Sequence, residues 1–290
     1  MTDQLPLPVT APFTKAQRAT VLNLVRRAAR TEIMPRFRAL DAGQISQKSS
    51  VTDLVTEADT SAEALIARGL QIAFPSAVIV GEEMSETHTD YREKLEQAEL
   101  GFLIDPIDGT WNFAHGLPLF GTMIAVCRFG RPVFGLIFDP IGNDAIWADI
   151  DTPSTWTGVS GRSRRVTTRA RANLAQMTGI IEPNFMPLPH RRAAMEACFD
   201  LAHAWTLRCS AHHYRLLAEG AVDFVMASKL APWDHAAGVM LCQQAGGYSA
   251  MLDGTAYTTS ITSGYLLSAA DEATWKRLAA HFSALLEPAE

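Results

Sequence analysis

The sequence predicts an α/β fold in which helices pack against sheets. Apolar runs of strand length alternate with helix-length segments that carry an apolar stripe, and this order is typical of layered folds. Residues 119 to 150 add three apolar runs separated by short turn segments, which predict three antiparallel strands. Hydrophobic residues form 48% and charged residues 19% of the 290 residues, so the chain is long and apolar enough to bury a large core.

The chain is expected to begin with a loose tail and two helices. Residues 1 to 13 contain three prolines, and residues 14 to 40 place apolar side chains at helical spacing. The stretch T-S-A-E has the form of a capping box between Thr60 and Glu63, so the second helix is predicted to start at Thr60. It is predicted to end near Phe74, because a proline follows.

The remaining elements divide into two halves, residues 14 to 175 and 176 to 290. The first half should contain strands at 77 to 80, at 102 to 104 and in the antiparallel region, with short strands and loops after it. In the second half, strands are expected at 177 to 181, 224 to 226 and 265 to 268, and helices at 190 to 201, 212 to 219, 234 to 245 and 271 to 286.

The net charge and the four cysteines limit the cellular compartment and the classes of partner that we expect for the protein. A formal net charge of -6 argues against a general nucleic-acid binder, which normally carries a basic excess. The N-terminus has no basic segment followed by an apolar core, and no apolar run reaches membrane-spanning length, so neither a secretory signal nor a membrane partner is expected. A cytoplasmic protein with reduced thiols fits the four widely spaced cysteines, Cys127, Cys198, Cys209 and Cys242.

Residues 101 to 113, G-F-L-I-D-P-I-D-G-T-W-N-F, hold the first candidate site. Asp105 and Asp108 follow a short apolar run, and two carboxylates this close repel each other unless a cation lies between them. Gly109 lets the backbone turn or approach a ligand, and Thr110 could begin a helix whose free N–H groups attract an anion. A divalent metal beside a phosphate is one interpretation, and a solvated turn rich in Asp, Pro and Gly is the other.

Three further acidic stretches follow the same pattern. They are K-S-S-V-T-D-L-V-T-E-A-D from Lys48 to Asp59, G-E-E from Gly81 to Glu83, and P-W-D-H-A-A-G from Pro232 to Gly238. Taken alone, Asp234 would be a helix N-cap and Glu82 a solvated surface acid. Together with the first stretch they place carboxylates beside strand ends and helix starts, where sites form in layered α/β folds.

The four stretches, taken in order, resemble the inositol monophosphatase family of metal-dependent sugar-phosphate phosphatases: L-V-T-E-A-D, G-E-E, D-P-I-D-G-T-W-N-F and W-D-H-A-A-G, within residues 48 to 268. The resemblance implies an α-β-α-β-α layered fold, a homodimer, and a small-molecule phosphate ester as substrate. It also implies Mg²⁺ as the cofactor, with two or three ions in the site, and inhibition by lithium. Carboxylates suit this cofactor, because Mg²⁺ prefers hard oxygen ligands.

The resemblance further implies which residues hold the metal. Glu82, Asp105 and the backbone carbonyl of Ile107 match the ligands of a first ion. Asp105, Asp108 and Asp234 match those of a second. Two ions bridged in this way can stabilise both the attacking and the leaving oxygen of an in-line displacement.

Other matches concern the substrate and the attacking water. Asp108, Gly109 and Thr110 fall where the family contacts the substrate, with the two backbone amides on its phosphate. Thr110 and Asp59, together with Glu82, match the catalytic group that orients and activates the water. Lys48 matches a lysine near the metals that does not bind them directly.

The match weakens at two places that concern substrate choice. Inositol-specific members carry a glutamate seven residues before the W-D aspartate, and this chain has Ala227 there, so an expected polyol contact is missing. The family's G-S/T-A-A helix start is altered to R-C-S-A, and His212 and His213 beside it could face the substrate or be structural. Lys229 and Arg208 could favour a second anionic group or be solvated charges.

We therefore expect a phosphomonoesterase that hydrolyses a small phosphorylated alcohol resembling inositol 1-phosphate. Histidinol phosphate, fructose 1,6-bisphosphate and 3′-phosphoadenosine nucleotides are alternative substrates, because relatives with this fold use each. A binding or regulatory protein without turnover is the alternative from another class. The intact set of acidic residues argues against it, since a binding module has no need of every metal ligand.

Overall fold

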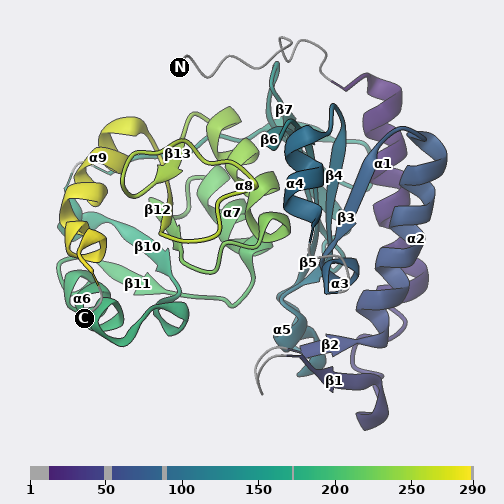
Figure 1. The fold of residues 1–290 in the computed structure, drawn as a ribbon, viewed down its shortest axis with the longest axis horizontal. Coiled ribbons are helices and arrows are strands. Elements are labelled where there is room, and N and C mark those ends of the chain that lie inside the picture. Colours follow the sequence, from purple (N-terminus) through teal and green to yellow (C-terminus); the bar gives the residue numbers. More distant parts are fainter. Residues whose placement is uncertain (1–12, 49–53, 87–89, 172, 289–290) are drawn as a thin grey trace.

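The computed structural model describes residues 13–48, 54–86, 90–171 and 173–288. Helices and sheets alternate in five layers, in the order helix, sheet, helix, sheet, helix (Figure 1). One large sheet comes from the first half of the chain and the other from the second half. The layered α/β fold expected from the sequence is confirmed.

The larger sheet contains seven strands. They are β3 (Val78–Gly81), β4 (Gly101–Asp108), β5 (Gly121–Arg128), β6 (Arg131–Asp139), β7 (Asp144–Asp149), β8 (Thr152–Thr157) and β9 (Ser163–Arg165). Only the β3–β4 pair is parallel, and the antiparallel strands predicted between residues 119 and 150 are confirmed as β5, β6 and β7. β4 continues past its predicted end, so the first acidic stretch lies within the sheet.

Helices α1 (Lys15–Ala28) and α2 (Glu57–Ala73) cover the outer face of this sheet (Figure 1). Residues 1 to 12 of the predicted tail lie outside the described residues. Phe13, the last residue of that tail, is buried and stacks on Phe74 with ring centroids 5.6 Å apart. This residue therefore belongs to the core and not to a loose segment.

The predicted start of α2 at Thr60 is wrong. Thr56 is the N-cap, and it forms a reciprocal capping box with Asp59. The sequence contains two adjacent boxes, T-E-A-D at 56–59 and T-S-A-E at 60–63, and the helix uses the earlier one, which places the Asp59 carboxylate on its buried side. α1 also ends earlier than predicted and continues as a π-helical segment, Ala29–Ile33.

Helices α7 (Ser210–Ala218) and α8 (Pro232–Gln244) form the layer between the two sheets (Figure 1). α8 lies very close to β6. A Cβ atom built on Gly135 would come within 2.5 Å of the carbonyl oxygen of Ala237, so only glycine allows this approach. This close contact sets the position of α8 against β6, and with it the position of the W-D motif in the first turn of α8.

The smaller sheet has the strand order β11-β10-β12-β14-β13. Its strands are β10 (Thr178–Ile181), β11 (His203–Trp205), β12 (Phe224–Ala227), β13 (Tyr248–Met251) and β14 (Leu266–Ala269), and α6 (Leu188–Cys198) and α9 (Glu272–His281) cover its outer face (Figure 1). The predicted strands are confirmed as β10, β12 and β14. β11 and β13 were not predicted, because each is short and mixes polar with apolar residues.

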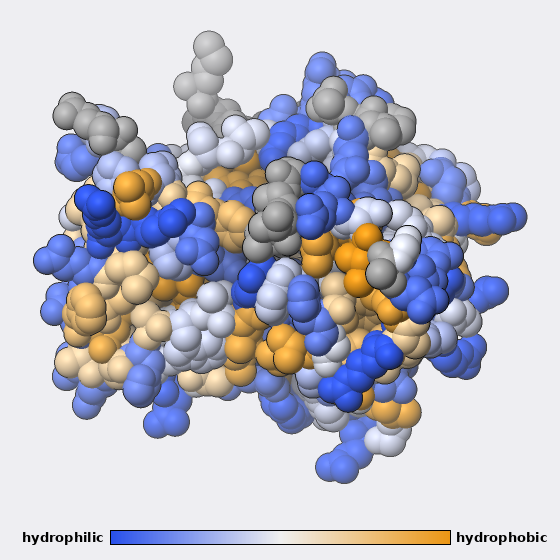
Figure 2. Space-filling model, turned by 90° about the horizontal axis from the view of Figure 1, so that it is seen from below, coloured by the Kyte–Doolittle hydropathy of each residue, from blue (hydrophilic) through white to orange (hydrophobic). Residues whose placement is uncertain are grey.

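Short elements complete the described chain. They are β1 (Ile45–Gln47), β2 (Leu54–Thr56), α3 (Glu82–Ser85), α4 (Tyr91–Gln97), α5 (Thr110–Ala114) and the 3₁₀ segments Ala42–Gln44, Leu174–Gln176, Pro183–Phe185 and Ser283–Leu286. The boundary between the two halves at residue 175 stays a prediction. α8 belongs to the second half of the sequence but packs on the larger sheet, which comes from the first half. Over the described residues, every helix is too short or too polar to cross a membrane. Figure 2 shows hydrophilic and hydrophobic residues interspersed over the face seen from below.

Candidate active site

A bulge at the end of β4 carries the two central carboxylates. The register with β5 shifts between Asp105 and Asp108, so β4 leaves the regular ladder at this point. Pro106 lies inside the bulge, where its missing N–H costs no ladder bond, and its carbonyl accepts a hydrogen bond from the Thr122 hydroxyl at 2.8 Å. Bulges re-aim side chains, and here both aspartates face one cavity.

Gly109 connects the bulge to α5 in a conformation that glycine adopts most easily. Its φ angle is 88°, and a Cβ atom there would lie 2.8 Å from the carbonyl oxygen of Leu119. The Asn112 side chain holds the surrounding loops, because its amide donates to the carbonyls of Leu119 and Leu207 at 2.9 and 2.7 Å. The backbone N–H groups at the start of α5 are thereby fixed beside the aspartates.

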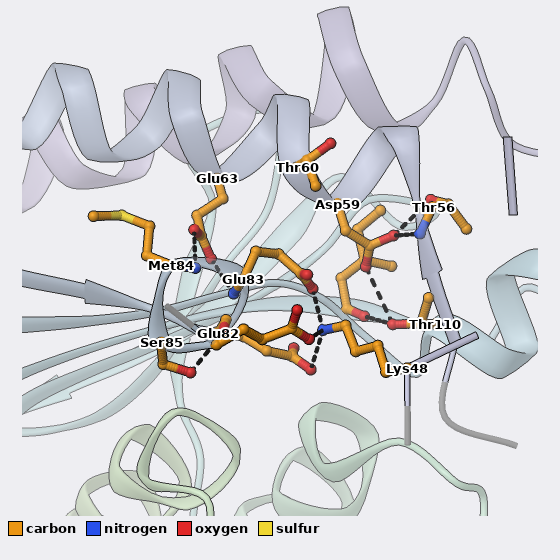
Figure 3. Close-up of polar contacts among 12 residues, drawn as sticks. Lys48, Thr56, Asp59, Thr60, Glu63, Glu82, Glu83, Met84, Ser85 and Thr110 are labelled. Atoms are coloured by element: carbon orange, nitrogen blue, oxygen red, sulfur yellow. Dashed lines mark hydrogen bonds and ion pairs between the residues drawn. The ribbon is translucent and has the colours of Figure 1, made fainter. Parts of the chain in front are cut away.

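Thr110 and Asp59, predicted as a pair, are brought together by α5 and α2 (Figure 3). The Thr110 hydroxyl oxygen lies 3.1 Å from Asp59 Oδ1 and 2.9 Å from the carbonyl oxygen of Ile107. Asp59 Oδ2 accepts hydrogen bonds from the backbone N–H and the hydroxyl of Thr56, at 2.9 and 2.5 Å. Burial raises the pKa of Asp59 to about 7. The capping box of α2 thus also orients the carboxylate toward Thr110.

Glu82 begins α3 within a cluster of acids around Lys48 (Figure 3). Lys48 Nζ lies 3.3 Å from the carboxylate of Glu82, 2.7 Å from that of Glu83 and 3.2 Å from that of Glu86. Burial lowers the pKa of Lys48, but these carboxylates raise it by more, so the ammonium stays charged. The Glu63 carboxylate accepts from two successive backbone N–H groups of α3 and holds the turn in place.

Asp108 is held from the opposite side by α7. Its Oδ2 accepts from the Cys209 thiol at 3.0 Å and from the backbone N–H of Ala211 at 2.5 Å. Burial raises the pKa of Asp108 to about 7, with a further contribution from the charge of Asp234. Asp234 itself lies in the first turn of α8, and its predicted position as the N-cap is wrong, because Pro232 starts the helix and Ala231 is the N-cap.

These elements line a cavity of about 520 Å³ between the two sheets. Two predicted residues, Lys48 and Asp59, lie behind its wall and contact Glu82 and Thr110. The predicted residues on the wall itself are Glu82, Asp105, Ile107, Asp108, Gly109, Thr110 and Asp234.

The chemistry of this wall suits a hard cation. Asp105 is buried, and its Oδ1 has no hydrogen-bond partner among the described residues. Burial, and then the charge of Glu82, raise the pKa of Asp105 well above its usual value. In the described part of the chain, no three acidic, histidine or cysteine side chains already close around one point. The assignment of a hard cation to this site therefore rests on Asp105 Oδ1, which has no hydrogen-bond partner among the described residues, and on several carboxylates that repel one another without a cation.

Three residues considered for substrate choice do not reach the cavity wall that the described residues form. His213 is buried, and its Nε2 accepts from the backbone N–H of Leu207 at 3.0 Å. Burial lowers the pKa of His213 to about 3, so its ring is neutral. His212 lies beside it, and this placement favours the structural alternative for both histidines. Ala227 is buried in β12.

Much of the cavity wall was not singled out from the sequence. Arg208 and Lys229, which were weighed against solvated charges, both lie on it. Of the other wall residues, five lie within the quoted motifs but were assigned no role in the site, and four lie outside any motif, in the segments after β10 and β11. Together these wall residues are Leu54, Trp111, Glu182, Asn184, Phe185, Thr206, Cys209, Ser210 and His235.

Comparison with known proteins places this site in a family. The model of the inositol monophosphatase family matches residues 10–287. The chain belongs to the inositol monophosphatase family. It is 31% identical to a histidinol-phosphatase of Streptomyces coelicolor over 78% of this chain and 84% of the relative. It is 32% identical to the Nus factor SuhB of Escherichia coli over 78% of this chain and 83% of the relative.

Solved structures of inositol monophosphatases share the fold. The Thermotoga maritima enzyme superposes with a TM-score of 0.78 at 22% identity, covering 95% of this chain and 100% of that one. The SuhB protein of Bartonella henselae gives a TM-score of 0.77 at 24% identity, covering 92% and 98%. Membership of this metal-dependent family makes the protein a phosphoric monoester hydrolase.

Proposed function

We propose that this inositol monophosphatase family member is a Mg²⁺-dependent phosphomonoesterase that cleaves a small phosphorylated alcohol by attack of water. The observation that carries the proposal is the convergence of Asp105, Asp108 and Asp234 with Glu82 on the cavity whose wall also holds Thr110. Glu82, Asp105 and the Ile107 carbonyl would hold one ion, and the three aspartates a second. The bound ions would neutralise the phosphate and stabilise the attacking and leaving oxygens.

The residues of this chain have separate tasks in that reaction. The Thr110 hydroxyl can accept a proton from the attacking water while it donates its own to Asp59 Oδ1, 3.1 Å away. Asp59 is held for this by two hydrogen bonds from Thr56. The backbone amides of Gly109 and Thr110 would bind the phosphate oxygens. The Lys48 ammonium offsets the repulsion between the carboxylates of Glu82 and Glu83.

The proposed substrate is a small phosphate ester whose alcohol part is not limited to inositol. A carboxylate at position 227 would contact ring hydroxyls, and the buried Ala227 supplies none. The relative from Streptomyces coelicolor is named a histidinol-phosphatase, which supports a wider choice of alcohols. Inositol 1-phosphate and histidinol phosphate are therefore the first candidates, followed by fructose 1,6-bisphosphate and 3′-phosphoadenosine 5′-phosphate.

Further parts of the proposal rest on the family resemblance. We propose that the protein is a cytoplasmic homodimer without nucleic-acid or membrane partners. Lithium should inhibit it by occupying the site of Asp108 and Asp234. A regulatory role without turnover is disfavoured, because the cavity retains the carboxylates that only metal-dependent chemistry requires.

The test is release of inorganic phosphate from the four candidate esters and from glycerol 2-phosphate, with Mg²⁺ and with EDTA. We expect hydrolysis of at least one ester that depends on Mg²⁺ and stops when EDTA is added. A folded protein that releases no phosphate from any of the five esters over a range of Mg²⁺ concentrations contradicts the proposal.

A further inference from the structure

The cavity contains a carboxylate beside the position where the family's polyol-binding glutamate is missing. β10 and β12 are parallel neighbours, and their last paired residues are Ile181 and Met226. Glu182 follows the first and Ala227 the second, so the two lie level on adjacent strands. Glu182 lies on the cavity wall, and its Oε1 accepts a hydrogen bond from the Thr206 hydroxyl at 3.1 Å. A carboxylate has about four acceptor positions, so this bond leaves capacity for a ligand.

Arg208 lies next to this carboxylate in an unusual backbone conformation. Its φ angle is 55°, which is uncommon for a residue other than glycine and often marks a functional site. Its backbone N–H donates at 3.0 Å to the same Thr206 hydroxyl oxygen that binds Glu182. Its guanidinium carbon lies 4.2 Å from the centre of the Trp111 ring. Thr206 therefore links the carboxylate to a stack of Arg208 on Trp111, and the Trp111 ring also stacks on His115 with centroids 4.1 Å apart.

A second aromatic ring belongs to the same part of the wall. Phe185 lies in the 3₁₀ segment directly after Glu182, and it is 54% exposed although it is large and apolar. Lys229 Nζ lies 5.8 Å from the centre of this ring, and a ring so exposed in the cavity is suited to stacking on a planar group. The carboxylate near these flat surfaces can accept an N–H bond from the edge of such a group.

We propose that Glu182, with the flat surfaces of Arg208 and Phe185, binds a planar heterocycle that carries a ring N–H group, such as imidazole, on the alcohol part of the phosphate ester. This inference rests on the proposed phosphomonoesterase function and names the class of alcohol that the site selects. Glu182 is then a specificity-determining residue, supplied from β10 where inositol enzymes use the strand of Ala227.

The wall favours a heterocycle over the two other groups that a carboxylate could bind. A polyol could use the polar groups of the wall but gains little from a flat ring face, whereas a heterocycle can use both the Glu182 carboxylate and the exposed Phe185 ring. An aliphatic ammonium would be attracted by Glu182 and the other acids of the wall and repelled by Arg208 and Lys229, but it has no flat face to stack on Arg208 or Phe185. A planar ring with an N–H group uses both the carboxylate and the flat surfaces.

The experiment compares kcat/KM for histidinol phosphate, ethanolamine phosphate, inositol 1-phosphate and glycerol 2-phosphate at fixed Mg²⁺. The first carries an imidazole ring and an amine, the second an amine without a ring, and the third only hydroxyls. We expect histidinol phosphate to be preferred over each of the others by at least ~10-fold, because a site built to accept an N–H bond discriminates strongly against alcohols that lack it.

Two variants then test the residues, and a third serves as control. Glu182→Ala should lower the ratio of kcat/KM for histidinol phosphate to that for glycerol 2-phosphate by at least ~10-fold, since loss of a hydrogen bond to a charged group is of that size. Arg208→Gly removes the flat guanidinium but suits the positive φ, so it should fold and lower the same ratio. Glu272→Gln, an exposed acid in α9, should leave the ratio unchanged.

The outcomes separate this inference from the proposed function. If no ester is hydrolysed with Mg²⁺, the phosphatase proposal fails first. If glycerol 2-phosphate is hydrolysed but histidinol phosphate is not preferred, or if both variants fold and keep the ratio, the heterocycle site is refuted. Preference for ethanolamine phosphate would assign Glu182 to an ammonium, and preference for inositol 1-phosphate to hydroxyls, and either result overturns the proposal.

Discussion

Asp105 shows how much of the candidate site depends on one side chain. It is buried, one of its oxygens has no partner among the described residues, and it lies where both predicted ions would meet. Such a group destabilises the fold without metal, because a buried carboxylate needs a partner or must be protonated. A bound metal ion would supply the missing partner, and this explains why a buried carboxylate whose Oδ1 has no hydrogen-bond partner among the described residues is present at position 105.

Replacing Asp105 with asparagine should therefore separate activity from stability. Asp105→Asn removes a shared metal ligand, and Mg²⁺-dependent hydrolysis should fall by more than the ~10–100-fold typical of groups that only support metal ligands. Without metal, the variant should be at least as resistant to heat as the parent, because one repelling charge is gone and the volume is kept. Activity and melting temperature in EDTA are the measurements. Asp200→Asn, at an exposed acid, is the control, and full activity of Asp105→Asn would contradict the metal assignment.

Thr110 allows a second test at the same scale. Thr110→Ala should lower kcat by ~10²–10⁴-fold, the usual contribution of positioned proton transfer, and change KM little, because the backbone amide stays in place. Thr110→Ser keeps a hydroxyl within reach of Asp59 and should retain most of the rate. The measurement is the steady-state kcat and KM of both variants. A loss confined to KM would assign the hydroxyl to substrate binding instead.

At the scale of the elements, the sequence predicted what is local and missed what depends on packing. The β5–β7 strands and the end of α2 follow from apolar runs and a proline. The start of α2 could not be decided from the sequence, because two capping boxes follow one another and the acids of both, Asp59 and Glu63, are buried in the fold. The bulge in β4 was also not predicted, since it appears only when β5 pairs with β4.

The contact between β6 and α8 leads to a prediction about stability. Gly135→Ala would push a Cβ atom to within 2.5 Å of the carbonyl oxygen and 3.0 Å of the Cα atom of Ala237, and backbone cannot move aside as a side chain can. The free energy of unfolding should fall by ~1–3 kcal/mol, the usual cost of overpacking. Urea denaturation measures the change. Gly43→Ala, where a Cβ meets nothing within 4 Å, should be neutral or slightly stabilising.

At the scale of the whole molecule, the site joins two sheets that are distant in sequence. The metal-binding side comes from short contiguous motifs on β4, α3 and α8, so it could be predicted from the sequence. On the substrate side Arg208 was considered, but Glu182 was not, because it lies in a loop after β10 and only the packing of β10 beside β12 brings it to the cavity. His212 and His213 were also considered because they lie beside the altered helix start, although α7 turns His213 inward.

Because the carboxylates come from both halves of the fold, metal binding should stabilise the whole molecule. Glu82 and Asp105 belong to the larger sheet and its loops, Asp234 to the middle helical layer, and an ion between them would link these layers. A ligand that binds only the folded state adds ~2.7 kcal/mol at a concentration of 100 times its dissociation constant. For a chain of this size, that corresponds to a rise of roughly 5 °C in melting temperature.

The measurement is the melting temperature as a function of Mg²⁺ concentration, with matched ionic strength supplied by NaCl. Asp105→Asn should abolish most of the rise, whereas Asp200→Asn should preserve it, because the second acid is exposed and distant from the cavity. A rise that is equal in NaCl and in MgCl₂ would show screening of surface charges and not occupation of the site. A rise that survives in Asp105→Asn would contradict the assignment of Asp105 as the ligand that both proposed ions share.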